Sequence, residues 1–228
     1  MREDLLKIVL EDSTLKDLDE DFKHLFRSWF NPGFLKLEKI TWDTKAAILE
    51  RIIKYEKVHK IKNMDDLKRR LEEDRRFFAY FHPVLNDEPL IFVQVAFTQG
   101  LATSIQDIIK PKTDDKLKAD TATFYSISNC QQGLTSVTLG NFLIKRVVYE
   151  IQQEDPKIKN FGTLSPLPGF VDWFNYLNEK QIIDTVGSED FSKIKFLHKS
   201  EAKVGDPRII EHQKILKKLV VHYLLKEK

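Results

Sequence analysis

The chain has 228 residues with 42% hydrophobic content, and its 37 Lys and Arg nearly balance its 35 Asp and Glu, for a net charge of +2. These values predict a soluble globular chain with a sizeable core and exclude the basic footprint of a nucleic-acid-binding protein, so no nucleic acid is expected as a partner. Cys130 is the only cysteine, which excludes an internal disulfide or a cysteine-rich zinc site, and the histidines form no close ligand pair, so no metal is predicted.

The N-terminal residues 1–29 predict one helix, because apolar residues recur at three and four positions: Leu18, Phe22, Leu25, Phe26 and Trp29. The acidic opening, MREDLLKIVLEDSTLKDLDEDF, has neither a signal region nor an Arg-rich transit pattern, and no run of 18 apolar residues occurs in the sequence. We therefore expect no membrane partner and a cytoplasmic location, with the mitochondrial matrix or the peroxisome as the alternative in a eukaryote.

From residue 30 onward, strand patterns and helix patterns alternate. Apolar runs predict strands at residues 34–42, 77–84, 89–97, 121–129 and 159–165. Helical periodicity or composition predicts helices at residues 46–56, 64–76, 104–109 and 141–153, and a polar loop covers residues 110–120. This order predicts an α+β fold in which helices cover the faces of a mixed sheet. His82 is expected at a strand end, and His222 in the last helix, facing water.

The junction at residues 131–151, QQGLTSVTLGNFLIKRVVYEI, predicts a loop followed by an amphipathic helix. The helix carries an apolar stripe that is expected to pack on the sheet: Leu143, Ile144, Val147, Val148 and Ile151. Before it, Gly133 and Gly140 bracket small and β-branched residues, so that backbone N–H groups and the helix N-terminus can point at one spot suited to a pyrophosphate. A strand-to-helix turn without a ligand is the alternative that this spacing leaves open.

The stretch NFGTLSPLPGF, residues 160–170, ends a strand at a serine. Pro166 and Pro168 fix two φ angles and remove two backbone donors, so Ser165 is the last residue before a rigid exit. A side chain held in this way suits an active site. It also suits a turn in which the hydroxyl bonds to nearby backbone.

Several long segments of the sequence occur together in one protein family. FFAYFHPVLNDEPLIFVQVAFT, SIQ, FYSISNCQQGL, LGNFLIKRVV and TLSPLPGF follow in this order and at this spacing in malonyl-CoA decarboxylases, and the chain resembles that family from Leu18 to Leu177. The resemblance implies a mixed-sheet catalytic domain of the GNAT (acyl-CoA N-acyltransferase-like) fold over residues 30–228, preceded at residues 1–29 by the last helix of a helical domain. It also implies an oligomeric carboxy-lyase of fatty-acid metabolism that splits malonyl-CoA to acetyl-CoA and carbon dioxide without a metal or an organic cofactor.

The resemblance also implies site residues. In this family the strand-to-helix loop cradles the CoA pyrophosphate, and the matching residues here are Thr135, Ser136, Val137, Thr138, Leu139, Gly140 and Asn141. The catalytic serine of the Leu-Ser-Pro-x-Pro-Gly-Phe motif, which is also expected to contact malonyl-CoA, falls on Ser165. Family members commonly have glycine where this chain has Ser136.

A partner histidine for this serine is implied in an Asn-Pro-x-x-x-Phe-His segment, which we expect beyond Lys228; none of the six histidines present is carried over. The chain is therefore expected to be the middle of a longer protein and to be inactive by itself. Three functions stay open: a malonyl-CoA decarboxylase, an acyltransferase of the same fold that moves an acetyl group to an amine, and a non-catalytic CoA-binding or regulatory module.

Overall fold

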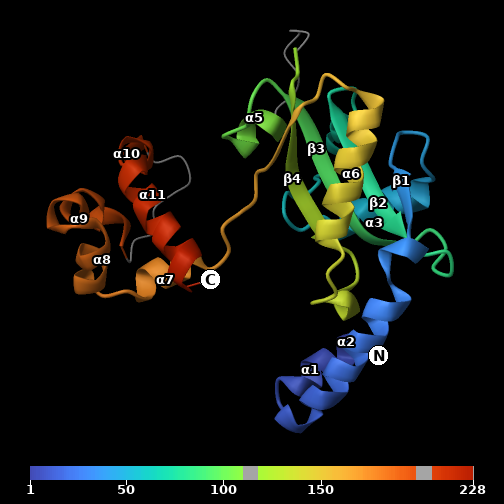
Figure 1. Cartoon of the computed structure of the whole chain (residues 1–228), viewed down its shortest axis with the longest axis horizontal. Coiled ribbons are helices and arrows are strands. Elements are labelled where there is room, and N and C mark those ends of the chain that lie inside the picture. Colours follow the sequence, from blue (N-terminus) through green and yellow to red (C-terminus); the bar gives the residue numbers. More distant parts are fainter. Residues whose placement is uncertain (110–117, 199–206, 228) are drawn as a thin grey trace. The chain divides into compact units, whose positions relative to one another are not determined.

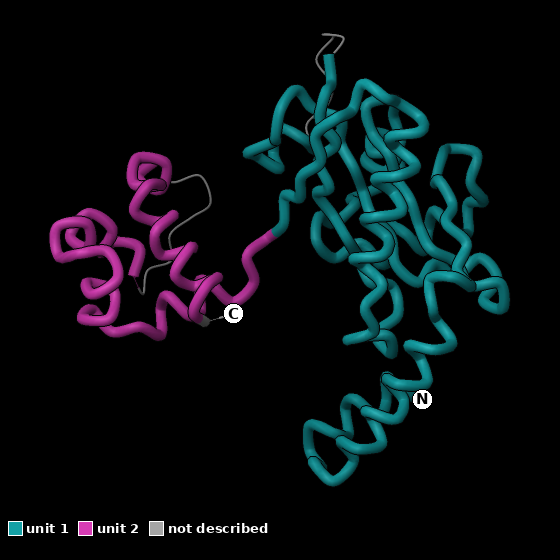
Figure 2. The backbone as a smooth tube through the Cα atoms, in the orientation of Figure 1, with its two compact units in different colours: residues 1–165 teal, residues 166–228 magenta. Residues whose placement is uncertain are grey.

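The computed structural model describes residues 1–109, 118–198 and 207–227. The chain divides into two compact units, Met1–Ser165 and Pro166–Lys228, coloured separately in Figure 2. The division falls directly after Ser165, where the sequence predicts a rigid exit. Across the described ranges, no helix combines the length and the apolar character needed to cross a bilayer.

Unit 1 is built around a five-stranded mixed sheet in the order β1-β2-β3-β4-β5 (Figure 1). The strands are β1 (Lys36–Lys39), β2 (Arg75–Phe81), β3 (Pro89–Thr98), β4 (Thr121–Asn129) and β5 (Asn160–Thr163). Neighbouring strands from β1 to β4 pair antiparallel, and β5 pairs parallel to β4. The predicted mixed sheet is confirmed, and each predicted strand is present.

Helices cover both faces of this sheet. One face packs on α6 (Gly140–Glu154), whose Leu143, Val147 and Ile151 are fully buried in the larger core with Ile144 and Val148 beside them, as the stripe predicts. The other face packs on α3 (Ala46–Tyr55) and α4 (Met64–Arg70) through a second core, and the short α5 (Ile105–Ile109) packs next to it.

Strand β4 contains a bulge at Tyr125, because Gln94 pairs with Ser126 while the next residue, Val95, pairs with Phe124. Successive side chains of a strand alternate between faces, so the extra residue shifts all that follow it. Phe124 therefore packs on the α6 side, whereas Ser126 and Ser128 both face α3.

The bulge brings these two serines to a buried carboxylate. Glu56, the residue after α3, is 3% exposed and accepts hydrogen bonds from Ser126 (2.7 Å), Ser128 (3.2 Å) and the side chain of Gln94. It also accepts the backbone N–H groups of residues 58 and 59, at 2.8 and 2.9 Å. A buried charge is tolerable when its acceptor positions are filled, and this one ties α3 to the two central strands.

The hydroxyl of Tyr125 extends this network. It donates to Gln94 at 2.9 Å, and burial raises the pKa of Tyr125 to about 12, so the hydroxyl keeps its proton. Gln94 is fully buried, and its oxygen also accepts from Arg70. The central strands are thus fixed by a polar network on the face opposite α6.

The N-terminal segment forms two helices, α1 (Arg2–Val9) and α2 (Lys16–Trp29), where the sequence predicts one. The reason is local. Asp12 accepts the backbone N–H of Thr14 at 2.9 Å and its hydroxyl at 2.6 Å, and a 3₁₀ turn at Ser13–Leu15 follows. Such side-chain bonds to the backbone compete with the helix interior and interrupt it.

The charged helix predicted over residues 64–76 ends earlier, at Arg70. Arg75 and Arg76 instead open β2, pairing with Ala96 and Val95 of β3, so tertiary pairing overrides their helical propensity. The first strand is also shorter than predicted, because a turn that uses the Thr44 hydroxyl follows Ile40. Most of the predicted polar loop, residues 110–117, lies outside the described residues.

Unit 2 is helical and has its own core. Its elements are α7 (Phe170–Tyr176), α8 (Glu179–Val186), α9 (Ser188–Ile194), α10 (Pro207–Glu211) and α11 (Gln213–His222), with a π-helical turn at Tyr223–Glu227. His222 ends α11, as predicted, but it is half-buried and stacks on Trp173 with ring centroids 6.0 Å apart, so it faces water only in part. Stacking on the aromatic ring of Trp173 covers one face of the imidazole.

We predict that Glu56→Ala lowers the free energy of unfolding by about 3 kcal/mol or more, because it leaves buried serine, amide and backbone donors without an acceptor. Urea denaturation followed by circular dichroism measures this. Glu50→Ala is the matched control, since Glu50 lies exposed on α3, which ends just before Glu56, and its loss should change stability by no more than about 0.5 kcal/mol. Equal effects of the two substitutions would contradict the proposed importance of the network.

Candidate functional site

The loop between β4 and α6 is anchored by buried side chains and exposes the residues between them. Leu134, Val137 and Leu139 are 3%, 6% and 1% exposed, respectively, and belong to the larger core. Thr135, Ser136, Thr138 and Asn141 are exposed. The loop is therefore fixed at three points and presents its backbone to solvent between them.

Every second backbone N–H group of this loop is already hydrogen-bonded within the loop. The N–H groups of residues 135, 137 and 139 bond to carbonyls of residues 132, 134 and 137, at 3.0, 2.9 and 2.9 Å. Within the described residues, the N–H groups of Ser136 and Thr138 have no such acceptor. Neither do those of Gly140 and Asn141 in the first turn of α6, where helices leave N–H groups unbonded.

The N-terminus of α6 is also open electrostatically. Leu139 occupies the N-cap and offers no side-chain acceptor, and the first turn holds no acidic residue. Unbonded N–H groups and the positive end of the helix dipole together favour a negatively charged group such as a pyrophosphate. Of the seven residues that the sequence indicated, Ser136, Thr138, Gly140 and Asn141 have unbonded N–H groups, whereas the N–H groups of Thr135, Val137 and Leu139 are bonded within the loop.

Ser136 has a φ of +68°, in the left-handed region that favours glycine. This conformation gives a physical reason for glycine at this position, the residue that the sequence resemblance implies there. The serine side chain is exposed, and the strain lies in the backbone.

Gly140 and Gly133 bracket the loop, and the space around both would admit a small side chain. A Cβ at Gly140 would lie 3.7 Å from Ile91 and 3.9 Å from Ile127, both of the sheet, and a Cβ at Gly133 would lie 3.7 Å from the backbone of Glu3. These are ordinary van der Waals distances, so packing against the sheet and against α1 does not by itself require glycine at either position.

Arg2 connects α1 to this loop. Its Nη1 donates to the carbonyl oxygens of Gly133 at 2.5 Å and Thr135 at 2.8 Å, and its Nε donates to Asp19 of α2 at 2.8 Å. Both partners of the ion pair are buried, with side chains 1% and 8% exposed. Burial alone would raise the pKa of Asp19, but hydrogen bonds and charges from Arg2 and Lys23 outweigh it and hold the pKa below its ordinary value.

Ser165 and the loop lie toward the same end of the sheet, where parallel strands β4 and β5 have their C-terminal ends. The loop follows β4, and Ser165 follows β5. Ser165 is exposed, and no residue in the described ranges donates to or accepts from its hydroxyl. The last backbone bond before it joins the N–H of Leu164 to the carbonyl of Phe124 at 2.8 Å.

Beyond this point, no strand among the described residues pairs with the outer edge of β4, which we call its free edge. β5 pairs only with Thr121–Phe124, whereas β4 continues for five residues to Asn129, about 16 Å at 3.3 Å per residue. An extended ligand with amide groups could lie along this edge between Ser165 and the α6 loop, because an unpaired strand offers alternate donors and acceptors.

Histidine, cysteine and metal chemistry have weaker support. His59 faces the polar network: its Nε2 is buried with no partner among the described residues, and burial lowers its pKa, which leaves the ring neutral at pH 7. His82 follows β2 directly, as predicted, and its Nδ1 accepts the N–H of Val84 at 3.2 Å. Burial raises the pKa of Cys130, so its thiol is not a ready nucleophile. No cluster of three or more potential metal ligands occurs within the described part of the chain.

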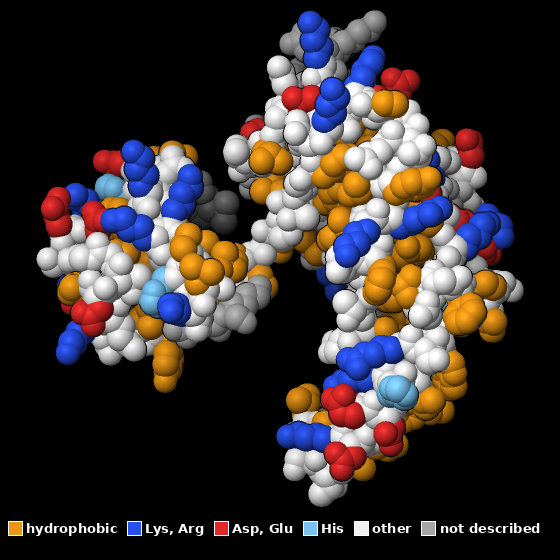
Figure 3. Space-filling model, viewed as in Figure 1, with side chains coloured by type: hydrophobic (Ala, Val, Ile, Leu, Met, Phe, Trp, Pro, Cys, Tyr) orange, Lys and Arg blue, Asp and Glu red, His pale blue; other side chains and the backbone are white. Residues whose placement is uncertain are grey.

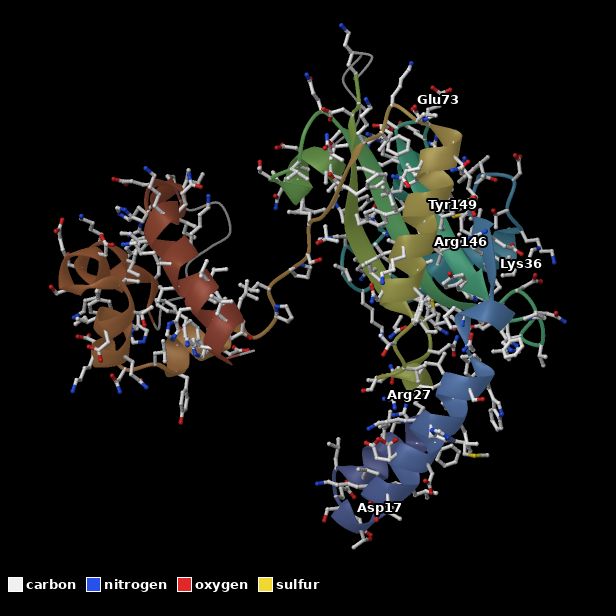
Figure 4. The ribbon with its side chains drawn as sticks, in the orientation of Figure 1. Asp17, Arg27, Lys36, Glu73, Arg146 and Tyr149 are labelled. Carbon is white, nitrogen blue, oxygen red and sulfur yellow. The ribbon has the colours of Figure 1, made fainter. Side chains whose placement is uncertain are left out.

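A groove of about 950 Å³ lies between β1 and α6, but its charges are already matched. Lys36 pairs with Glu38 and Arg146 with Glu150, each at 2.8 Å, and Lys39 pairs with Glu154 at 2.9 Å. Lys36 and Arg146 are labelled in Figure 4. Internally paired charges leave little free charge for an anionic ligand, so we do not assign a site here.

The sequence does not predict the roles of two residues that shape the site. Arg2 reaches carbonyls 131 and 133 positions further along the chain, and Glu56 reaches serines 70 and 72 positions away. Neither has a motif around it. Only the tertiary fold shows that they hold the loop and the strand that carry the candidate ligand contacts.

The comparisons with known proteins agree along the whole chain. The family model described as malonyl-CoA decarboxylase C-terminal domain matches residues 33–228, and the model described as malonyl-CoA decarboxylase N-terminal domain matches residues 1–30. Among curated proteins, the mitochondrial malonyl-CoA decarboxylase of Anser anser anser is 42% identical over 183 residues, which is 78% of this chain and 36% of that protein. That of Rattus norvegicus is 36% identical over 220 residues, 91% of this chain and 44% of the relative.

Solved structures extend this similarity to the fold. The malonyl-CoA decarboxylase of Rhodopseudomonas palustris matches with a TM-score of 0.86 at 42% identity, covering 100% of this chain and 56% of its own. That of Cupriavidus metallidurans matches with a TM-score of 0.80 at 38% identity, covering 100% and 57%. The chain thus spans less than half the length of these two curated relatives and somewhat more than half of these two structures.

We predict that Ser136→Gly raises the free energy of unfolding by about 0.5–1 kcal/mol, because glycine adopts a positive φ without the steric cost. Thermal and urea denaturation measure this. Thr138→Gly is the control in the same loop: Thr138 is exposed and has no positive φ, so glycine there should lower stability through chain entropy. If both substitutions destabilise the protein equally, the strain at Ser136 is disproved.

Proposed function

This chain belongs to the malonyl-CoA decarboxylase family, and from that membership we propose that the protein converts malonyl-CoA to acetyl-CoA and carbon dioxide. The observation that carries the proposal is that the α6 loop and Ser165 follow the C-terminal ends of two parallel strands, and that the free edge of β4 runs between them. An acyl-CoA has three parts that match them in order: a pyrophosphate, an extended arm with amide groups, and a thioester.

We propose that the loop at residues 135–141 binds the pyrophosphate of CoA. The N–H groups of Ser136, Thr138, Gly140 and Asn141 supply donors, and the helix dipole supplies positive potential. Val137 and Leu139 hold the loop in place from the core side. The pantetheine arm then lies along the free edge of β4 and brings the thioester toward Ser165.

We propose that Ser165 acts on the thioester. Loss of carbon dioxide leaves an electron pair that the thioester takes up as an enolate, so the site has to stabilise a developing negative oxygen and then deliver a proton to carbon. A fixed hydroxyl can donate a hydrogen bond to that oxygen. Proton delivery needs a partner acid, for which the family resemblance implies a histidine.

We further propose that residues 30–228 are a catalytic domain of the GNAT type, preceded at residues 1–29 by the end of a helical domain. Antiparallel strands β1 to β4, followed by α6 and the parallel strand β5, support this proposal. The curated relatives are named mitochondrial, which favours the mitochondrial matrix over the cytoplasm as the location.

We predict that Ser165→Ala in the full-length protein lowers kcat by about 10²–10⁴-fold, the range for a lost oxyanion donor or proton-transfer group, while CoA affinity changes little. Acetyl-CoA formation from malonyl-CoA measures this. Ser28→Ala, at an exposed position of α2, is the control and should retain wild-type kcat. Retention of more than about a tenth of kcat by Ser165→Ala would assign the serine to the turn alone. Binding of CoA without any decarboxylation by the wild type would favour the non-catalytic module.

We expect this chain, by itself, to self-associate, because α2 exposes an apolar face. Leu18, Leu25 and Trp29 are 45%, 42% and 57% exposed, and Figure 3 shows hydrophobic side chains gathered along one side of the N-terminal helices. Apolar surface of this kind associates in water. Light scattering at rising concentration should therefore show oligomers, and Leu25→Glu with Trp29→Glu should reduce them. Val84→Glu, at an exposed turn, is the control. A monomer at high concentration would contradict the expectation.

A further inference from the structure

We propose that Arg2 is a positioning residue for the pyrophosphate loop, which couples the N-terminal helices to CoA affinity. The proposal rests on the proposed function of the loop at residues 135–141. Its starting observation is a buried guanidinium on α1 that spends two of its hydrogen bonds on carbonyl oxygens of this loop, those of Gly133 and Thr135.

The bond to Thr135 determines where the next N–H points. A trans peptide is planar, so its C=O and N–H point in opposite directions. Because Arg2 holds the carbonyl of Thr135, the N–H of Ser136 is directed away from Arg2. That N–H has no acceptor among the described residues and is one of the donors that we assign to the pyrophosphate.

Ser136 also adopts a conformation that needs outside support. Its φ of +68° is costly for serine, so an isolated loop would leave this state readily. The two Arg2 bonds fix the peptides on the N-terminal side of Ser136, and the buried side chain of Val137 fixes the next residue. The strained residue is therefore held between two anchors.

Arg2 itself is held rigidly. Asp19 accepts from its Nε at 2.8 Å and its Nη2 at 3.4 Å, and Lys23 approaches Asp19 at 3.1 Å. A planar guanidinium fixed by a carboxylate on one side presents its remaining donors in a fixed direction. The N-terminal helices thus set the geometry of the loop through Arg2.

The chain offers a matched control in Arg75 of β2, a buried and ion-paired arginine at another place. Arg75 is 6% exposed, pairs with Asp74 through Nη1 at 2.7 Å, and donates to the carbonyls of Asp74, at 2.9 Å, and Ile108. These partners lie outside both the loop at residues 133–141 and the polar network around Glu56. Arg75→Met therefore removes a comparable buried arginine and leaves the loop untouched.

The test measures binding of CoA and of pantetheine, which lacks the pyrophosphate, by calorimetry with this chain. We expect Arg2→Met to weaken CoA binding about tenfold or more, as for one lost charge-assisted hydrogen bond, and to leave pantetheine binding unchanged. Arg2→Lys, which keeps the charge but cannot bridge both carbonyls, should be intermediate. Arg75→Met should leave the CoA affinity of the folded protein unchanged.

Each other outcome overturns one defined statement. Equal CoA affinity in wild type, Arg2→Met and Arg2→Lys overturns the role of Arg2, and so does an equal loss of CoA and pantetheine binding. If Arg2→Met does not fold, Arg2→Lys decides, and wild-type affinity there overturns the proposal. Absence of CoA binding in the wild type would instead overturn the function proposed for the loop.

Discussion

In the part of the chain that the structure describes, strand β4 has two neighbouring strands along its first four residues and one along the rest, and the candidate site depends on this asymmetry. β5 leaves after Thr163, which ends the pairing at Phe124 and leaves the remaining edge of β4 open. The prolines after Ser165 make that departure permanent, because they cannot resume the ladder. One strand therefore provides both a scaffold for the sheet and an unpaired edge for a ligand.

Buried charges hold β4 and its loop from two sides. Glu56 fixes the strand through Ser126 and Ser128, which the bulge at Tyr125 turns toward it. Arg2 fixes the loop that follows. In each case several hydrogen bonds compensate the cost of burying the charge, and the result is a specific arrangement that apolar packing alone would not select. A backbone site for an anion requires such rigidity, since its donors cannot reorient as side chains do.

Much of this fold follows from patterns in the sequence. Period-two and continuous apolar runs predict all five strands, and the stripe from Leu143 to Ile151 predicts the buried face of α6. Glycine and proline placement, together with a family resemblance, indicates the loop and Ser165 as the candidate site. The predictions failed where a side chain competes locally with the helix and where a residue pairs with a distant strand. Asp12 interrupts a helical pattern by bonding to Thr14. Arg75 pairs with a strand that lies far from it in the sequence, although the residues around Arg75 favour a helix.

Binding of CoA to the loop can be followed directly at the backbone by ¹⁵N-resolved NMR of this chain. Titration with CoA should shift the amide signals of Ser136, Thr138, Gly140 and Asn141 most strongly, because their N–H groups would gain charged acceptors. Pantetheine should leave these four signals in place and shift amides along the free edge of β4. The strongest shifts at other positions, with these four amides unchanged at saturating CoA, would contradict a pyrophosphate site at the start of α6.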